Sequence, residues 1–300
     1  MFGGKDESSF ALIQGRTLAG VLLDEVALQP RSFVEQALAR CSVDGSKFWF
    51  NCNPDSPEHW FYKEWVLKAK EKNALHLHFL LDDNPSLSEK IRQRYESLHT
   101  GVFYQRYILG LWVVAQGLVY DFFGEEQITD EIPEYGEYYI SVDYGTLNPF
   151  SAGLWCKNGD KATRIREYYY SGRESGTQKT DEEYYQELEK LAGNLPIYRV
   201  IVDPSAASFI ATIKRHKRFS VRAADNEVLK GIRITSTLLK NGNLKIGSNC
   251  KDAIREFKLY QWDEKSEEDK VLKVNDHAMD EIRYFCATVM SRYMKYMGFR

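Results

Sequence analysis

The chain is poor in cysteine and has no long apolar run, and both shortages restrict its class. Its 300 residues contain five cysteines, no two of them spaced as C-x-x-C. An odd, scattered set predicts neither a disulfide framework nor a zinc site, and it favours a reducing compartment. No stretch approaches the roughly 18 consecutive apolar residues of a membrane span, and the start MFGGKDESS is not a signal peptide. We therefore expect a soluble cytoplasmic protein with no membrane partner.

The chain also lacks a large excess of either charge, since its formal net charge is only −3. The charge is distributed unevenly, because residues 1–136 carry a net charge of −7 and residues 137–300 a net charge of +4. A chain that is 43% hydrophobic and 28% charged is neither disordered nor fibrous. Its length is about twice that of an ordinary domain. The sequence thus predicts two units with different partners, and the overall charge balance does not exclude DNA.

The front of the chain alternates apolar runs with helical stretches. GVLLDEV (20–26) and KFWFNCNP (47–54) are typical of buried strands, and ALHLHFLL (74–81) alternates as a third strand does. Helices are predicted at residues 33–40 and 58–72. Strands that alternate with helices indicate a mainly parallel α/β sheet.

The back of the chain predicts a second sheet. Three strands joined by short turns, at 137–145, 149–157 and 163–170, predict an antiparallel meander. Alternating helices and strands follow, and an apolar stripe predicts a final helix over about 277–296. The acidic stretch at 116–136 contains Pro133 and has no sustained period, as a linker would. We expect an α/β fold in three parts: residues 1–115, a linker at 116–136 and residues 137–300.

Asp24 and Glu25 follow the apolar residues 21–23, at the carboxyl end of a predicted strand. In a P-loop ATPase an acid at this place holds Mg²⁺, and a following Glu polarises the attacking water. A solvated acidic turn is the alternative. The phosphate-binding loop G-x-x-x-x-G-K-[ST] is missing, because Gly3-Gly4-Lys5 is followed by Asp6 and lacks the upstream glycine. Either the acidic pair has no nucleotide role, or the chain starts partway through a domain.

A second group of acids lies in the back half. Asp143 and Asp203 end two predicted strands, while Asp276, His277 and Asp280 begin the final helix. This layout matches ribonuclease-H-like nucleases, in which two metal ions bind the attacking and leaving oxygens of a phosphodiester. Carboxylates suit Mg²⁺ and Mn²⁺, which prefer oxygen ligands. Turns and helix-dipole stabilisation would also explain these acids.

A basic segment, KRHKRFSVR, covers residues 214–222. It contributes Lys214, Arg215, Lys217, Arg218 and Arg222. Binding to the phosphate backbone of a nucleic acid is one use of such a segment, and a solvated helix end is the other.

Taken together, these segments resemble the large terminase subunit of tailed phages, specifically the PBSX-type group. Residues 20–54 resemble the back half of its ATPase domain, and residues 103–123 resemble its passage from ATPase to nuclease. Four segments resemble its nuclease domain and occur in the same order: SVDYGTLNP, VDPSAASFI, ADNEVLKGI and DHAMDEIRYF. The likeness covers nearly the whole chain, and it implies a partial P-loop ATPase sheet followed by an RNase H-like α/β nuclease domain.

The resemblance also implies residue roles in the front part. Asp24 would be the magnesium acid of the Walker B strand, and Glu25 the catalytic glutamate. The segment from Asn51 through Asn53 to Pro54 matches the family's coupling segment. ATP would be a cofactor only in the context of the complete ATPase domain, since the Walker A loop is missing. We expect a truncated gene product, a split gene product or a partial record.

In the back part, the resemblance implies that Asp143, Asp203 and Asp280 bind two Mg²⁺ or Mn²⁺ ions. His277 would be an auxiliary ligand or a proton handler, and Asp276 either a ligand or a helix cap. The implied activity is metal-dependent cutting of concatemeric double-stranded DNA, coupled in the full protein to ATP-driven packaging into a capsid.

The implied partners are the small terminase subunit and the portal protein, with a ring oligomer forming in the bacterial host cytoplasm. Two alternatives remain from the sequence. One is an inactive remnant that binds DNA or docks on a portal. The other is an RNase H-like recombinase, which should not carry residues 20–26 and FNCNP (50–54).

Overall fold

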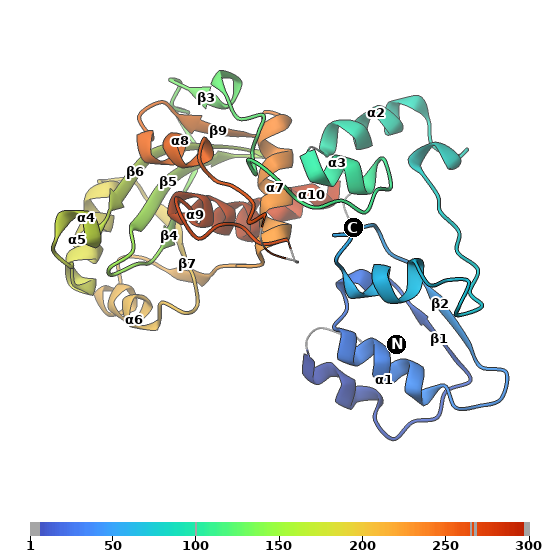
Figure 1. Ribbon diagram of the computed structural model, residues 1–300. Coiled ribbons are helices and arrows are strands. Elements are labelled where there is room, and N and C mark those ends of the chain that lie inside the picture. The colour runs from blue at the N-terminus through green and yellow to red at the C-terminus, as the bar shows by residue number, and fades with distance from the viewer. Residues whose placement is uncertain (1–6, 100, 265, 267–268, 297–300) are drawn as a thin grey trace. The chain divides into compact units, whose positions relative to one another are not determined.

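The computed structural model describes residues 7–99, 101–264, 266 and 269–296 (Figure 1). The chain divides into two compact units, each with its own sheet. The first unit comprises Met1–Arg92, Val102–Ala115 and Glu264–Asp269, and the second comprises Gln93–Gly101, Gln116–Asp263 and Lys270–Arg300. Gly3-Gly4-Lys5, the nearest match to a phosphate-binding loop, lies outside the described residues.

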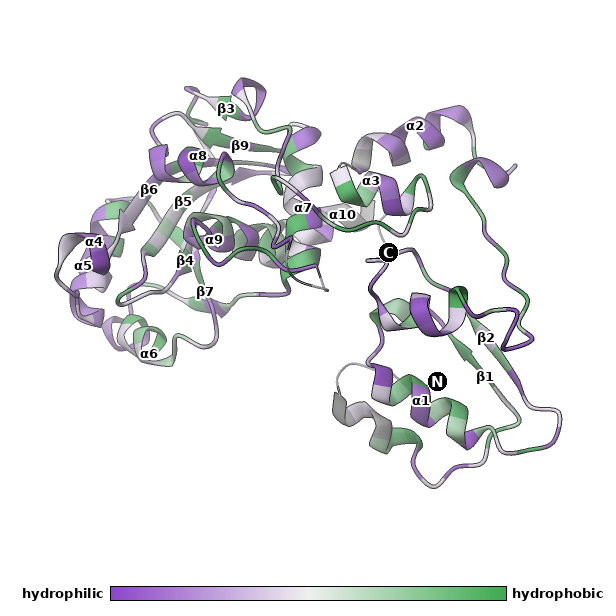
Figure 2. Cartoon of the chain, in the orientation of Figure 1, coloured by the Kyte–Doolittle hydropathy of each residue, from purple (hydrophilic) through white to green (hydrophobic). Residues whose placement is uncertain are grey.

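The first unit is built on two parallel strands, β1 (Gly20–Leu23) and β2 (Lys47–Phe50), which pair from Gly20↔Lys47 to Leu23↔Phe50. Its core joins Leu23 to the helix α1 (Arg31–Arg40) through Phe33, Val34 and Ala37. The other elements up to residue 115 are the 3-10 helices η1 (Glu7–Ile13), η2 (Val26–Leu28) and η4 (Leu81–Asp83), the π-helix η3 (Tyr62–Val66), and the helices α2 (Glu89–Leu98) and α3 (Gly101–Tyr107). Hydrophilic residues predominate along α2 (Figure 2).

Three expectations for this unit need correction. Both strands form, but each is buried on one face at most, since Leu23 is in the core whereas Leu22 is 67% and Trp49 is 54% exposed. The cause is that the described core covers only one face of a two-stranded sheet. The helix expected at 58–72 is shorter, with turns after residue 66.

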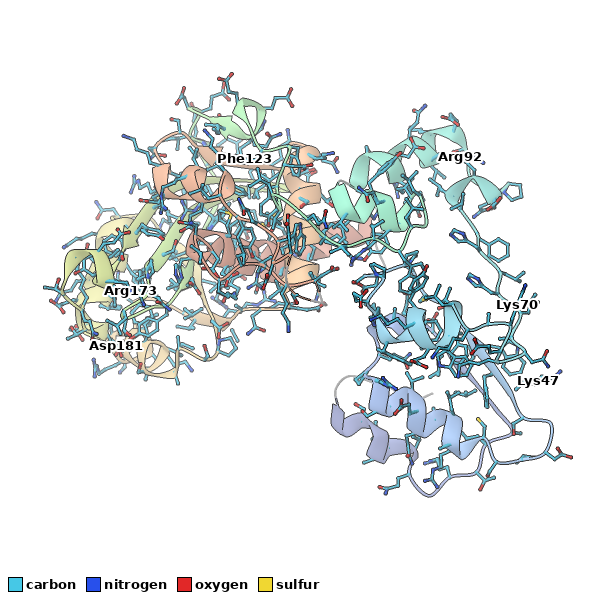
Figure 3. The ribbon with its side chains drawn as sticks, viewed as in Figure 1. Lys47, Lys70, Arg92, Phe123, Arg173 and Asp181 are labelled. Atoms are coloured by element: carbon cyan, nitrogen blue, oxygen red, sulfur yellow. The ribbon has the colours of Figure 1, made fainter. Side chains whose placement is uncertain are left out.

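The strand expected at 74–81 does not form. Residues 74–80 are extended but pair with no described strand, and their side chains project from the ribbon between Lys70 and Arg92 (Figure 3). Leu75 is 84% and Phe79 is 73% exposed. Alternating apolar and polar residues favour an extended backbone, but a strand forms only when a neighbouring strand supplies the backbone hydrogen bonds.

The second unit contains a seven-stranded sheet in the order β3-β9-β6-β5-β4-β7-β8. Its centre is the predicted meander, in which β4, β5 and β6 are antiparallel. β7 and β8 add in parallel beyond β4, and β9 and β3 add in parallel beyond β6. The strands are β3 (Ile128–Thr129), β4 (Glu137–Asp143), β5 (Phe150–Asn158), β6 (Lys161–Tyr170), β7 (Ile197–Val202), β8 (Val221–Ala223) and β9 (Leu244–Gly247).

The alternation of β4 sends its side chains to two different layers. Ile140 and Val142 join the core that includes Tyr184 of α5 and Phe209 of α6. Tyr139, by contrast, contacts Phe285 of α9. The helices of this unit are α4 (Gly172–Ser175), α5 (Asp181–Ala192), α6 (Ala207–His216), α7 (Val228–Lys240), α8 (Lys251–Phe257), α9 (His277–Phe285) and α10 (Ser291–Tyr296), with the π-helix η6 (Cys286–Met290) joining the last two.

The predicted final helix is therefore present, with a π-helical section in its middle. The linker expected at residues 116–136 is instead packed into the second unit. Tyr120 is buried against Phe257, and β3 pairs with β9. An aromatic side chain stabilises the fold most when it is buried, and this outweighs the acidic composition of the segment. Among the described residues, no helix is long and apolar enough to cross a membrane.

Candidate active site

The end of β4 and the start of α9 meet at one hydrogen bond. Asp143 is the last residue of β4, and its Oδ2 lies 2.9 Å from Nδ1 of His277, the first residue of α9. Burial raises the pKa of Asp143, although the hydrogen bond from His277 acts to lower it. Burial alone would lower the pKa of His277, but the hydrogen bond and charge of Asp143 outweigh burial and raise it. Burial and the hydrogen bond thus act in opposite directions on each member of the pair.

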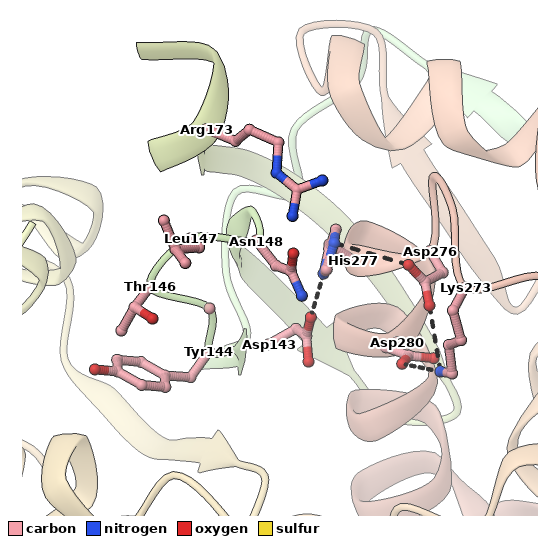
Figure 4. Close-up of a pocket in the computed structure, with 11 residues that line it drawn as sticks. Asp143, Tyr144, Thr146, Leu147, Asn148, Arg173, Lys273, Asp276, His277 and Asp280 are labelled. Carbon is pink, nitrogen blue, oxygen red and sulfur yellow. Dashed lines mark hydrogen bonds and ion pairs between the residues drawn. The ribbon is translucent and has the colours of Figure 1, made fainter. Parts of the chain in front are cut away.

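A pocket of about 780 Å³ opens beside this pair (Figure 4). One wall is the loop 144–148, which is held tightly by two glycines. A Cβ on Gly145 would lie 2.4 Å from the carbonyl oxygen of Asn148, and one on Gly172 would lie 2.5 Å from that of Thr146. The pocket is lined by Asp143, Tyr144, Gly145, Thr146, Leu147, Asn148, Arg173, Lys273, Asp276, His277 and Asp280.

Arg173 reaches toward the Asp143–His277 pair from α4 (Figure 4). Its backbone N–H donates to the carbonyl of Leu147 over 3.1 Å, which fixes α4 against the loop. Its guanidinium has no ion pair among the described residues. The pocket therefore combines acids on one side with an uncompensated cation on the other.

The acids at the start of α9 hold two cations. Nζ of Lys273 lies 3.2 Å from Oδ2 of Asp276 and 3.1 Å from Oδ2 of Asp280. The other oxygen of Asp280, Oδ1, accepts from Nη2 of Arg283 over 2.9 Å. Asp276 occupies the N-cap position of α9, but its side chain makes no capping hydrogen bond.

Asp203 follows β7 and lies outside the pocket lining. It accepts from the backbone N–H of Ser205 over 2.7 Å and from Nδ2 of Asn226 over 3.0 Å. Burial would raise its pKa, but hydrogen bonds from Ser205, Asn226 and Tyr284 outweigh burial and lower it. The Tyr284 hydroxyl also lies 3.4 Å from Oδ1 of Asp143, so the two carboxyl groups share its single proton. Tyr284 is thus the link between Asp203 and the predicted ligand on β4.

The donor set has the chemistry that Mg²⁺ or Mn²⁺ requires, because it offers carboxylate oxygens and one imidazole. A further sign is that Oδ1 of Asp276 is buried without a hydrogen-bond partner among the described residues. Among all the described residues, no three His, Cys, Asp or Glu side chains are grouped closely enough to hold one ion. Binding of one ion by three of these groups would require carboxylates to leave their present hydrogen bonds.

In the first unit, the predicted acids lie at the end of β1. Glu25 has a left-handed backbone, with φ 51° and ψ 50°, and its N–H donates to Oδ1 of Asn51 over 2.8 Å. Such a conformation is unfavourable for a residue with a Cβ and is held here by its surroundings. Asp24 and Asn53 are exposed. The structure thus joins the predicted Glu25 to Asn51 by a hydrogen bond across the ends of β1 and β2.

The basic segment is only partly available to a ligand. Arg215 pairs with Glu182 over 3.0 Å, and Arg218 pairs with Glu189 over 3.0 Å. Lys214, Lys217 and Arg222 are exposed and make no side-chain ion pair with a described residue.

The sequence patterns do not predict three residues of the site. Arg173 and Lys273 line the pocket, and Tyr284 lies between Asp143 and Asp203. Lys273 could have been suspected, since it lies three residues before the acids of DHAMD. Arg173 and Tyr284 belong to common local patterns, and only the tertiary fold sets their roles.

The fold is a mixed α/β chain of two units, each with its own sheet, and the second unit carries the acidic pocket. The family described as terminase large subunit, T4likevirus-type, N-terminal, matches residues 1–127. The large terminase of the thermophilic bacteriophage D6E, solved with ADP, is 51% identical, with a TM-score of 0.90 over 96% of this chain and 73% of that one. A second crystal form of the D6E protein is 52% identical, with a TM-score of 0.91 over the same shares. Comparison with the curated proteins gives no match.

The chain belongs to the large terminase family. This membership decides against the recombinase alternative. The finer PBSX-type assignment stays a prediction from the sequence.

Proposed function

We propose that the second unit is a metal-dependent endonuclease that cuts concatemeric double-stranded DNA. The observation that carries this proposal is the pocket in which Asp143, His277 and Asp280 meet below Arg173. Membership in the large terminase family also supports the proposal, because the resemblance to that family implies a nuclease domain in this part of the chain.

Asp143, Asp203 and Asp280 would hold two Mg²⁺ or Mn²⁺ ions, with His277 as an auxiliary ligand or proton handler. When bound, such ions activate a water for in-line attack and stabilise the leaving oxygen. The chain's own contribution is to fix these groups. Asp143 is held by His277, Asp203 by Asn226, and Asp280 by Arg283.

Arg173 would bind a DNA phosphate across the pocket from the acids. A guanidinium suits this role, because its planar donors match two phosphate oxygens. Lys214, Lys217 and Arg222 would extend the phosphate contacts, while Arg215 and Arg218 would do so only after leaving Glu182 and Glu189.

Residues 1–115 would be the back part of an ATPase domain, and 137–300 the nuclease domain. D6E large terminase has been solved with ADP and with ATP-γ-S, which supports a nucleotide role for Asp24, Glu25, Asn51 and Asn53 in a complete ATPase domain. Packaging in the host cytoplasm would then involve a ring oligomer, the small terminase subunit and the portal protein.

The test is cleavage of supercoiled plasmid DNA by the purified chain in Mn²⁺ or Mg²⁺. We expect Asp143→Asn to abolish cutting while the far-UV spectrum stays unchanged. Asp252→Asn is the matched control, because Asp252 is partly exposed on α8 and lies outside the pocket. Undiminished cutting by Asp143→Asn would reject the assignment.

The inactive-remnant alternative predicts a different pattern. Such a chain would bind Ca²⁺ and DNA but would not cut in Mn²⁺. A calcium titration beside the cleavage assay therefore separates the two possibilities.

A further inference from the structure

We propose that Lys273 is a built-in counterion that occupies a cation subsite formed by Asp276 and Asp280, and that a divalent ion displaces it. Asp276 is then a ligand of that ion and not a helix cap. This inference rests on the proposed nuclease function and adds a residue and an exchange step to its site.

The position of Lys273 is the first observation. Its ammonium is within 3.2 Å of one oxygen on each acid, and it bridges them (Figure 4). The Lys273 side chain is 64% exposed, whereas those of Asp276 and Asp280 are 4% and 10% exposed. A flexible side chain thus covers two buried carboxylates from the solvent side, and it can leave without disturbing the core.

The unpaired oxygen of Asp276 is the second and independent observation. Its Oδ1 is buried and accepts no hydrogen bond from a described residue. The nearest cationic group is Nε2 of His277 at 3.8 Å, which is too long for a hydrogen bond. Buried carboxylate oxygens are normally paired, and an unpaired one is unfavourable unless a ligand completes it.

Asp280 differs from Asp276 in this respect. Both of its oxygens have partners, since Oδ1 accepts from Arg283 and Oδ2 faces Lys273. Lys273 therefore satisfies Asp280 but leaves Asp276 half satisfied. Lys273 contacts only Oδ2 of Asp276, whereas a divalent ion carries twice the charge and can bind both oxygens of one carboxylate, so it can also satisfy the unpaired Oδ1.

The test is calorimetric titration of the metal-free chain with MnCl₂, without DNA. Wild type is compared with Lys273→Met and with the control Lys258→Met, whose lysine is exposed at the end of α8. Removing the competing ammonium should tighten Mn²⁺ binding about tenfold or more, since charge-assisted hydrogen bonds are worth at least that factor. Lys258→Met should bind as wild type does.

The metal-free stabilities should change in the opposite sense. Without Mn²⁺, Lys273→Met should melt at a lower temperature than wild type, because the two acids repel one another. Saturating Mn²⁺ should remove that difference. Asp276→Asn should weaken Mn²⁺ binding in both backgrounds and leave the helical signal of α9 unchanged.

Unchanged or weaker Mn²⁺ binding by Lys273→Met would overturn the inference, as would unchanged binding by Asp276→Asn. If the methionine variant does not fold, Lys273→Gln serves the same comparison. The failure of the nuclease proposal is separate, because it would appear as absent cutting, whereas this titration contains no DNA.

Discussion

Nδ1 of His277 and Oδ2 of Asp143 lie 2.9 Å apart, although 134 residues separate them in the chain. This bond ties the first turn of α9 to the carboxyl end of β4. It also gives the buried carboxyl group of Asp143 a hydrogen-bond partner, so the two residues stabilise the site before any ligand arrives.

Replacing His277 by alanine should therefore destabilise the metal-free second unit. Asp143 would lose a donor while staying buried, which costs about 1–3 kcal/mol. Urea unfolding in EDTA measures the change. His76→Ala is the control, because His76 is exposed, and equal stability of the two variants would contradict the prediction.

Asp203 and Tyr284 should matter for cutting, although neither lines the pocket. Asp203→Asn should abolish plasmid cleavage, as removal of a ligand would. Tyr284→Phe should reduce cleavage with the fold retained, because its hydroxyl contacts both Asp143 and Asp203. Tyr198→Phe, at a tyrosine that is 52% exposed, should cut normally. Full activity in Asp203→Asn would exclude it as a ligand.

The pair formed by Arg164 and Glu281 should dominate the stability of the second unit. Nη2 of Arg164 lies 2.7 Å from Oε2 of Glu281, and both side chains are fully buried. Arg164→Met should cost about 3–5 kcal/mol, because it leaves an unpaired buried carboxylate. Arg215→Met breaks the exposed pair with Glu182 and should cost at most about 1 kcal/mol. Similar losses in urea unfolding would refute the distinction.

The first unit should lose stability in mild acid through His59. Burial lowers the pKa of His59, although the charge of Asp55 acts to raise it. The folded state therefore disfavours the protonated ring, so this contribution is present above the ordinary pKa of about 6.5 and is lost as pH falls below it. Melting temperatures at pH 7.5 and 5.5 should differ more in wild type than in His59→Gln. An unchanged difference would contradict the assignment, and His76→Gln is the matched control.

DNA affinity should depend on the exposed members of the basic segment. Replacing Lys214, Lys217 and Arg222 together by glutamine should weaken DNA binding. The slope of log K against log salt should fall by about 0.9 for each DNA phosphate that the variant no longer neutralises. Arg215 and Arg218 should contribute less, since they already pair with Glu182 and Glu189. Fluorescence anisotropy at several salt concentrations measures both effects, and equal weakening by the two sets of substitutions would contradict the prediction.

The strands of the meander are predictable because short, mostly apolar runs are separated by turns. Tyr139, Ile140 and Val142 belong to such a run and are buried on both faces of the sheet, so the pattern predicts β4 without its partners. The short strand β9 was missed, because its four residues include Lys245 and give little period. Segment 74–80 shows the reverse case, in which local preference is strong but no described strand pairs with it.

The site was predictable only in part. Asp143, His277 and Asp280 could be found because strand ends and helix starts are where α/β sheets place ligands. That Asp276 leaves one oxygen unpaired depends on side-chain packing, which no spacing reveals. The same is true of Arg173, whose approach to the pocket depends on Gly145 and Gly172 tightening the loop.

The exposed segment 74–80 should also affect the solubility of the protein. Its alternating Leu75, Leu77 and Phe79 are exposed, so we expect copies of the chain to associate through this segment, as they do at an unpaired β-edge. Charged residues flank it on both sides, with Lys70 and Lys72 before it and Asp82 and Asp83 after it. Such flanking charges oppose stacking between copies. High ionic strength screens these charges. We therefore expect concentrated protein to stay soluble at low salt and to aggregate when salt is added.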